Sequence, residues 1–152
     1  MIKRVSRLLL ACLPILLAFL APAQEYSRAE RQLLAATNRE RESRGLHALR
    51  WNDALAEAAR QHNQVMIEHQ SISHQFPGEP SLPTRVTRTG AHFSALAENV
   101  AEAPDPSQIH SLWMHSPGHR ANILDRDMDS IGIAVAERNG EFYAVEDFSK
   151  AR

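Results

Sequence analysis

The sequence predicts an α+β fold in one domain, with helices outside a small antiparallel sheet of about three strands. Three observations predict it. Apolar residues recur at helical spacing in two segments of the N-terminal half. Near the C-terminus they alternate on both sides of Asn139-Gly140, a strong signal for a two-residue hairpin. Finally, no repeat or linker divides the chain after residue 23.

Residues 1–23 are predicted to be a secretory signal peptide. Lys3, Arg4 and Arg7 precede an apolar run over residues 8–20, and Ala21-Pro22-Ala23 supplies small residues for cleavage after Ala23. The apolar run is shorter than the roughly 20 residues of a spanning helix. We therefore expect residues 24–152 to form a single domain without a transmembrane span.

Cys12 is the only cysteine, so the chain after cleavage has no disulfide. Leu9-Leu10-Ala11-Cys12 resembles a lipid-attachment box, which leaves lipidation of Cys12 open, although the apolar run continues well beyond it. An export signal without disulfides is typical of a bacterial periplasmic or secreted protein.

Charge excludes two classes of partner. The chain has 17 basic and 18 acidic residues, and removal of the signal peptide leaves 14 against 18. Nucleic acids and anionic membranes are bound by clusters of Lys and Arg, which this sequence lacks. We expect a monomer that binds neither.

Two helices are predicted before residue 70. Ser27-Arg28-Ala29-Glu30 is a capping box for the first, which Gly45 ends. Its charged residues are predicted to form a solvated face; they are Arg39, Glu40, Arg41, Glu42 and Arg44. Asn52 or Asp53 caps the second, whose apolar stripe includes His62. We expect His62 to be a hydrogen-bonded core residue rather than a ligand.

The middle of the chain is predicted to be a long loop over residues 70–93, because prolines and glycines interrupt it, and it carries His74 and His92. A short helical segment over residues 96–103 is predicted next, with Glu98 and Asn99.

A third predicted helix begins after Asp105 and includes Ile109, Leu112 and Trp113 on one buried face. Pro117 is predicted to end it and Gly118 to form a turn, so that His119 follows a sharp corner. His115 and His119 are therefore not expected to share a helical face as a metal pair.

The hairpin completes the predicted elements. Ile131, Ile133 and Val135 alternate on its first strand, and the return strand includes Glu146 and Phe148.

Three motifs together carry a family resemblance: Ser73-His74, Ala97-Glu98-Asn99-Val100, and Trp113 followed by Ser116-Pro117-Gly118-His119-Arg120-Ala121-Asn122-Ile123-Leu124. Across residues 33–148 the sequence resembles the CAP superfamily in its short bacterial form. This group includes cysteine-rich secretory proteins, venom antigens and plant pathogenesis-related proteins, and its domain is also called SCP-like.

The resemblance implies an alpha-beta-alpha sandwich with a cleft where His74, His119 and Glu98 converge. The family's second acid usually follows the helix tryptophan by three residues, and here Ser116 stands at that position. The other motif residues are assigned structural roles: Asn99, Trp113, Pro117, Gly118, Arg120 and Asn122.

The chemistry of these side chains leaves three functions open. Two neutral imidazoles can hold Zn2+ or another divalent cation weakly, with Glu98 orienting a histidine or a bound water. The expected function is thus a binding module for a metal ion, with a small apolar, peptide or cell-envelope ligand.

One alternative is a metal-assisted, peptidase-like hydrolase that uses Glu98 as the candidate catalytic residue, or Ser116 as nucleophile. Another is an interaction scaffold in which His74, Glu98 and His119 form only a structural network. The missing second acid favours binding over catalysis.

Overall fold

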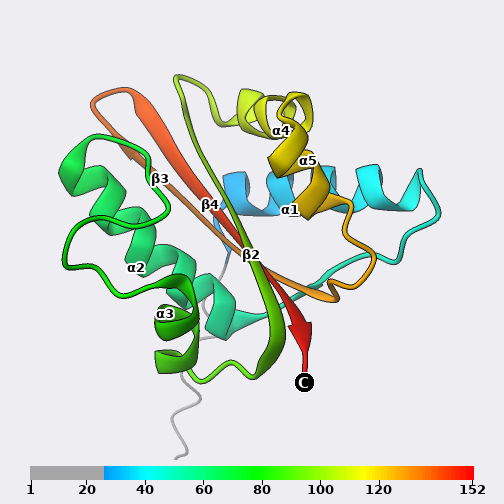
Figure 1. Cartoon of the computed structure of the whole chain (residues 1–152). Coiled ribbons are helices and arrows are strands. Elements are labelled where there is room, and N and C mark those ends of the chain that lie inside the picture. The colour runs from blue at the N-terminus through cyan, green and yellow to red at the C-terminus, as the bar shows by residue number, and fades with distance from the viewer. Residues whose placement is uncertain (1–25) are drawn as a thin grey trace, which may run out of the picture.

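The computed structural model describes residues 26–152 as a four-stranded sheet between two layers of helices (Figure 1). In chain order the elements are α1 (Arg28–Glu42), β1 (Arg50–Trp51), α2 (Asp53–His69), α3 (Leu82–Arg88), β2 (Phe93–Ala103), α4 (Pro106–His115), α5 (Pro117–Ile123), β3 (Ser130–Arg138) and β4 (Glu141–Ala151). The predicted sandwich is confirmed, with four strands rather than about three. The predicted signal peptide, with Cys12, lies outside the described residues.

The sheet has the order β1-β3-β4-β2, and only β1 is parallel to its neighbour. The predicted hairpin is confirmed as β3 and β4. Asn139 and Gly140 have φ values of 56° and 84° at its turn, and the right-handed twist of the strands favours such a turn.

The segment predicted to be helical over residues 96–103 is instead the edge strand β2. Its alanines and glutamates are reasonable helix formers, but it pairs with β4 along almost its whole length. Tertiary pairing overrides a weak local preference here. As a result Glu98 and Asn99 point to opposite faces of the sheet, because side chains alternate along a strand.

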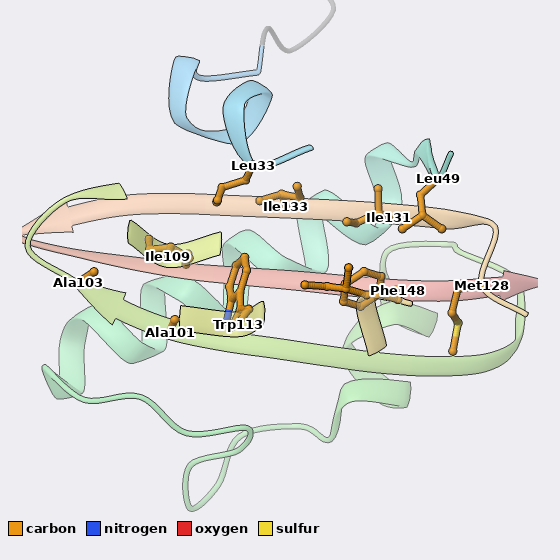
Figure 2. Packing of buried hydrophobic residues seen from close by; sticks show 12 residues of the cluster. Leu33, Leu49, Ala101, Ala103, Ile109, Trp113, Met128, Ile131, Ile133 and Phe148 are labelled. Atoms are coloured by element: carbon orange, nitrogen blue, oxygen red, sulfur yellow. The ribbon is translucent and has the colours of Figure 1, made fainter. Parts of the chain in front are cut away.

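One face of the sheet is covered by α1, α4 and α5, and the other by α2 and α3 (Figure 1). On the first face Ile109 and Trp113 of α4 pack with Phe148 of β4, and all three are fully buried (Figure 2). Leu112, predicted to share this face, is 49% exposed. It adjoins Trp113 in sequence, and the helix turns it outward.

On the second face α2 lies directly against β3 at Gly132. A Cβ atom at Gly132 would stand 2.0 Å from the backbone nitrogen of Ala56. Only glycine permits this close approach of helix to sheet.

The predicted capping box of α1 is present: Glu30 N–H donates to Ser27 Oγ, and Ser27 N–H donates to the Glu30 carboxylate. The predicted solvated face is wrong at Arg41, which is 1% exposed. Its guanidinium donates to the carbonyl oxygens of His47, Ile123, Asp125 and Met128. These bonds satisfy a buried cation, which explains why it can leave water.

The prediction that Gly118 forms a turn is also wrong. Ser116 is extended, with ψ 120°, as the residue before a proline prefers. Pro117 then occupies the first turn of a new helix, α5, where its fixed φ fits and its missing N–H costs nothing. His119 therefore lies on α5, and His115 lies on α4.

The predicted long loop contains one element that its sequence did not suggest, the helix α3. Pro83 is at the start of this helix, so a residue taken as a helix breaker begins one.

Candidate functional site

Glu98 of β2 is a buried carboxylate beneath the loop that carries His74. Its side chain is 3% exposed. The Oε1 atom accepts a hydrogen bond from His74 Nδ1 at 2.9 Å, and Oε2 accepts from the guanidinium of Arg85 on α3. Each carboxylate oxygen thus already has a donor.

His74 covers this carboxylate from the outside, with a side chain that is 61% exposed. Because Nδ1 bonds to Glu98, the proton is fixed on Nδ1 and the lone pair of the neutral ring is left on Nε2. The geometry therefore produces one defined tautomer, with its free nitrogen on the other side of the ring from Glu98.

The loop with His74 is held from below by two buried side chains. His62 Nε2 lies 2.7 Å from the Ser73 carbonyl oxygen, and its Nδ1 lies 2.6 Å from Glu79 Oε1. Arg85 donates to the carbonyl oxygens of His74 and Pro80 at 3.3 and 3.1 Å. The prediction that His62 is a hydrogen-bonded core residue is confirmed.

The charges of this cluster shift two pKa values in opposite directions. The hydrogen bond to Glu98 raises the pKa of His74 above its usual value, against burial and the charge of Arg85. Burial raises the pKa of Glu98, but the His74 bond and the charges of Arg85 and His62 outweigh burial, so this pKa is below its usual value. Glu98 is therefore ionised at neutral pH.

His119 lies at the start of α5, next to the same strand. Asn99 donates to its carbonyl oxygen at 3.2 Å, and Asn122 donates to the side-chain oxygen of Asn99 at 2.9 Å and to the Glu98 carbonyl oxygen at 3.3 Å. These amides tie α5 to β2, as structural roles for Asn99 and Asn122 would require. Burial lowers the pKa of His119, and the charge of His74 lowers it further.

The predicted site residues are brought together to different degrees. His74 and Glu98 are in direct contact, and His119 lies within electrostatic reach of His74. Ser116 lies at the junction of α4 and α5, where its N–H bonds to the carbonyl oxygens of Leu112 and Trp113, and its hydroxyl does not cap α5. Arg120 is exposed and reaches the Met114 carbonyl oxygen at 3.4 Å.

Metal binding would have few protein ligands. Within residues 26–152, no group of three or more His, Cys, Asp or Glu side chains is arranged to hold an ion. Two imidazoles suit a divalent cation such as Zn2+ chemically, but tight zinc sites use three or four protein ligands. A weak site completed by water is what the donor set allows.

Three residues of the cluster with buried side chains were not predicted from the sequence: Glu79, Arg85 and Asp147. Asp147 on β4 is directly opposite Glu98 on β2. The sequence offered no signal for this pairing while residues 96–103 were predicted to be helical.

Comparison with known families decides the assignment. The profile of the Cysteine-rich secretory protein family, CAP, matches residues 34–148. This chain belongs to the CAP family. The resemblance stated from the three motifs is thereby confirmed.

Relatives of this CAP protein occur in bacteria. It is 31% identical over 112 residues to the uncharacterized protein YkwD of Bacillus subtilis, a match that covers 73% of this chain and 44% of that protein. The structure of an SCP-domain extracellular protein from Bacillus anthracis has a TM-score of 0.74 and 26% identity, over 80% of this chain and 40% of that chain. This chain thus spans less than half the length of both.

An outer surface protein from Borrelia burgdorferi has the same fold, with a TM-score of 0.76 at 20% identity, over 82% of this chain and 93% of that chain. These structural neighbours of the CAP protein are extracellular or surface proteins. Among the helices of residues 26–152, none combines the length and the apolar character needed to cross a membrane.

Proposed function

We propose that this CAP protein is an exported binding module that holds a divalent metal ion through His74 and His119. The ion is Zn2+ or a cation of similar chemistry, bound weakly, with water in the remaining positions. A small apolar, peptide or cell-envelope ligand would bind beside it. Export to the periplasm or the medium is supported by the predicted signal peptide and by the extracellular or surface neighbours.

The single observation that carries the proposal is the bond from His74 Nδ1 to buried Glu98. Histidines that bind metals usually donate their other ring N–H to a carboxylate or carbonyl, which fixes the tautomer and increases the basicity of the ligating nitrogen. His74 has this arrangement. It is also more than half exposed, so an ion has access to it.

The same contacts argue against a hydrolase in which Glu98 activates water. Both of its oxygens already accept hydrogen bonds, one from His74 and one from Arg85, and its depressed pKa makes it a weak base. In the metal site Glu98 would orient His74 and not touch the bound ligand.

Calorimetric titration with zinc chloride tests the proposal. The wild type is expected to give a saturable heat that is lost in His74→Ala and in His119→Ala. The matched control is His92→Ala, which removes an exposed histidine from the loop before β2 and should leave the heat unchanged. Equal heats in all four proteins would overturn the proposal, because zinc would then bind elsewhere.

Glu98→Gln tests the orienting role. The amide keeps the size of the side chain and an oxygen that can accept from His74, but it removes the charge. We expect weaker zinc binding by roughly tenfold, the lower end of what loss of such a partner costs. Unchanged affinity would show that the carboxylate is not needed.

Acid should also weaken binding, because protonation of either ring removes its lone pair. The pKa of His74 is raised, so we expect affinity to fall as the pH drops through a range above that of an ordinary histidine. Zinc titrations across this range check the direction.

A further inference from the structure

A second acid, Asp147, lies next to Glu98 on the neighbouring strand. Asp147 of β4 is paired in register with Glu98 of β2, so the two side chains emerge from the same face of neighbouring strands. Asp147 is completely buried. In the ionised form, neither of its carboxyl oxygens has a hydrogen-bond partner among residues 26–152.

The groups around Asp147 disfavour its charged form. Glu98 on β2 is ionised, and Gly132, its neighbour on β3, has no side chain. Arg85 of α3 and His62 of α2 face Glu98, and the Arg85 guanidinium bonds to Glu98 and not to Asp147. Burial and then the charge of Glu98 raise the pKa of Asp147 well above its usual value and outweigh the charge of Arg85, which lowers it.

Protonation of Asp147 removes both the unfavourable buried charge and the lack of a hydrogen-bond partner. A protonated carboxyl group is a donor, and the carboxylate opposite it is an acceptor. A buried polar group without a hydrogen-bond partner destabilises the folded protein, so a hydrogen bond from Asp147 to Glu98 is favoured.

We propose that Asp147 is a positioning residue of the site: as a neutral acid it donates a hydrogen bond to Glu98 and so fixes the carboxylate that orients His74. Glu98 then accepts from three sides, from His74, from Arg85 and from Asp147. The inference deepens the proposed function, because the ring held in place is the proposed ligand His74. Its test uses protein without metal, so the two can fail independently.

The first measurement is the 13C chemical shift of the Asp147 carboxyl carbon in the wild type at pH 7. We expect the value of a protonated carboxyl group. The value of an ionised carboxylate would overturn the inference.

Two variants test the effect on His74. Asp147→Asn keeps an N–H donor at the same place, whereas Asp147→Leu has a similar volume and no donor. The readout is the pair of ring 15N shifts of His74 at a pH above its raised pKa, where the ring is neutral, assigned by their loss in His74→Ala. The wild type is expected to show a single tautomer with the proton on Nδ1.

We expect Asp147→Asn to retain this tautomer and Asp147→Leu to lose it, giving averaged shifts of two tautomers. Two results would overturn the inference. Wild-type His74 shifts in Asp147→Leu would mean that a residue of similar volume is enough at position 147. Averaged His74 shifts in Asp147→Asn would mean that an N–H donor there does not hold the tautomer. If Asp147→Leu does not fold, the wild-type carbon shift and Asp147→Asn still decide. If the shifts are as expected but the protein does not bind zinc, only the proposed function is refuted.

Discussion

The guanidinium of Arg41 is enclosed by carbonyl oxygens from three segments of the chain: residue 47 after α1, residues 123 and 125 at the end of α5, and residue 128 before β3. A hydrogen bond to a charged group contributes more than one between neutral groups. Arg41 therefore joins three segments that share no sheet or helix.

We predict that Arg41→Met lowers the free energy of unfolding by about 3 kcal/mol or more, because several buried carbonyl groups lose their donors. The control is Arg44→Met, three residues further on, where the side chain is 46% exposed and paired with Glu40. That change should cost less than about 0.5 kcal/mol. Urea denaturation of both variants measures the difference, and similar losses would contradict the prediction.

Glu146 is a different kind of buried group. It is fully buried on the α1 side of β4, where it accepts from Thr37 Oγ1 at 2.8 Å. Burial raises the pKa of Glu146 to about 8, against the bonds from Thr37 and Asn99. Its folded-state pKa is above that of an unfolded glutamate, so the folded protein binds the extra proton between these two values. Its contribution to stability is full at acidic pH and falls as the pH rises from about 4.5 to 8.

Glu146→Gln should remove this dependence, because an amide does not ionise. We expect the variant to be more stable than the wild type at pH 8, by on the order of 3 kcal/mol, and nearly equal to it at pH 4. Urea denaturation at both pH values is the measurement, with the exposed Glu102→Gln on β2 as control. The same difference in the free energy of unfolding at both pH values would contradict the titration of Glu146.

The burial of some single residues could not be predicted from the sequence. Arg41 and Arg44 occur in the same charged run, and only the fold shows that one is inside. His62 was predicted correctly, because the apolar residues around it define the buried stripe of a helix.

At the level of elements, α1, α2, α4 and the hairpin could be predicted because their signals are local, whereas α3 and α5 were missed. The capping box of α1, Asp105 at the start of α4 and Asn139-Gly140 each act within four residues. β2 could not be predicted from its own residues, because it forms against an edge of β4 that lies far along the chain. The misplaced strand also hid Asp147, since its position opposite Glu98 follows from that pairing.

Two glycines give opposite predictions for the elements that contain them. Gly132→Ala would put a methyl group into the backbone of α2, with Cβ 2.0 Å from Ala56 N and 2.3 Å from the Leu55 carbonyl carbon. Neither helix nor strand can yield at low cost, so we expect a loss of about 3 kcal/mol. Differential scanning calorimetry provides the measurement.

Gly118→Ala is the matched control and a test of α5. A Cβ atom at Gly118 meets nothing within 4 Å, and the residue is helical. Alanine should stabilise the protein by about 0.5 kcal/mol, since it is the better helix former. A destabilised variant would favour the turn that the sequence alone suggested.

At the level of the whole molecule, the family resemblance predicted more than the local signals did. It implied three layers and the convergence of His74 with Glu98, which are 24 positions apart in the chain. It did not reveal β1, because a strand of two residues has no pattern to detect.

We predict that the chain after residue 23 unfolds as one cooperative unit, since both faces of the sheet are packed and no linker divides it. Trp113 lies in the core between α4 and β4, so its fluorescence reports on one layer, while far-UV circular dichroism reports on all helices. In a Trp51→Phe background the two urea curves should coincide, and a reducing agent should not shift them. Separate midpoints would indicate two units.

The alternation along β2 has a consequence for anyone who wishes to move this site into another scaffold. Glu98 belongs to one layer of the protein and Asn99, which anchors the helix of His119, belongs to the other. Sliding the edge strand by a single position would exchange the two and break the contacts of Glu98 with His74 and of Asn99 with α5. Transfer of the site would therefore require the two strands in their native register together with the helices on both faces of the sheet, and not the side chains alone.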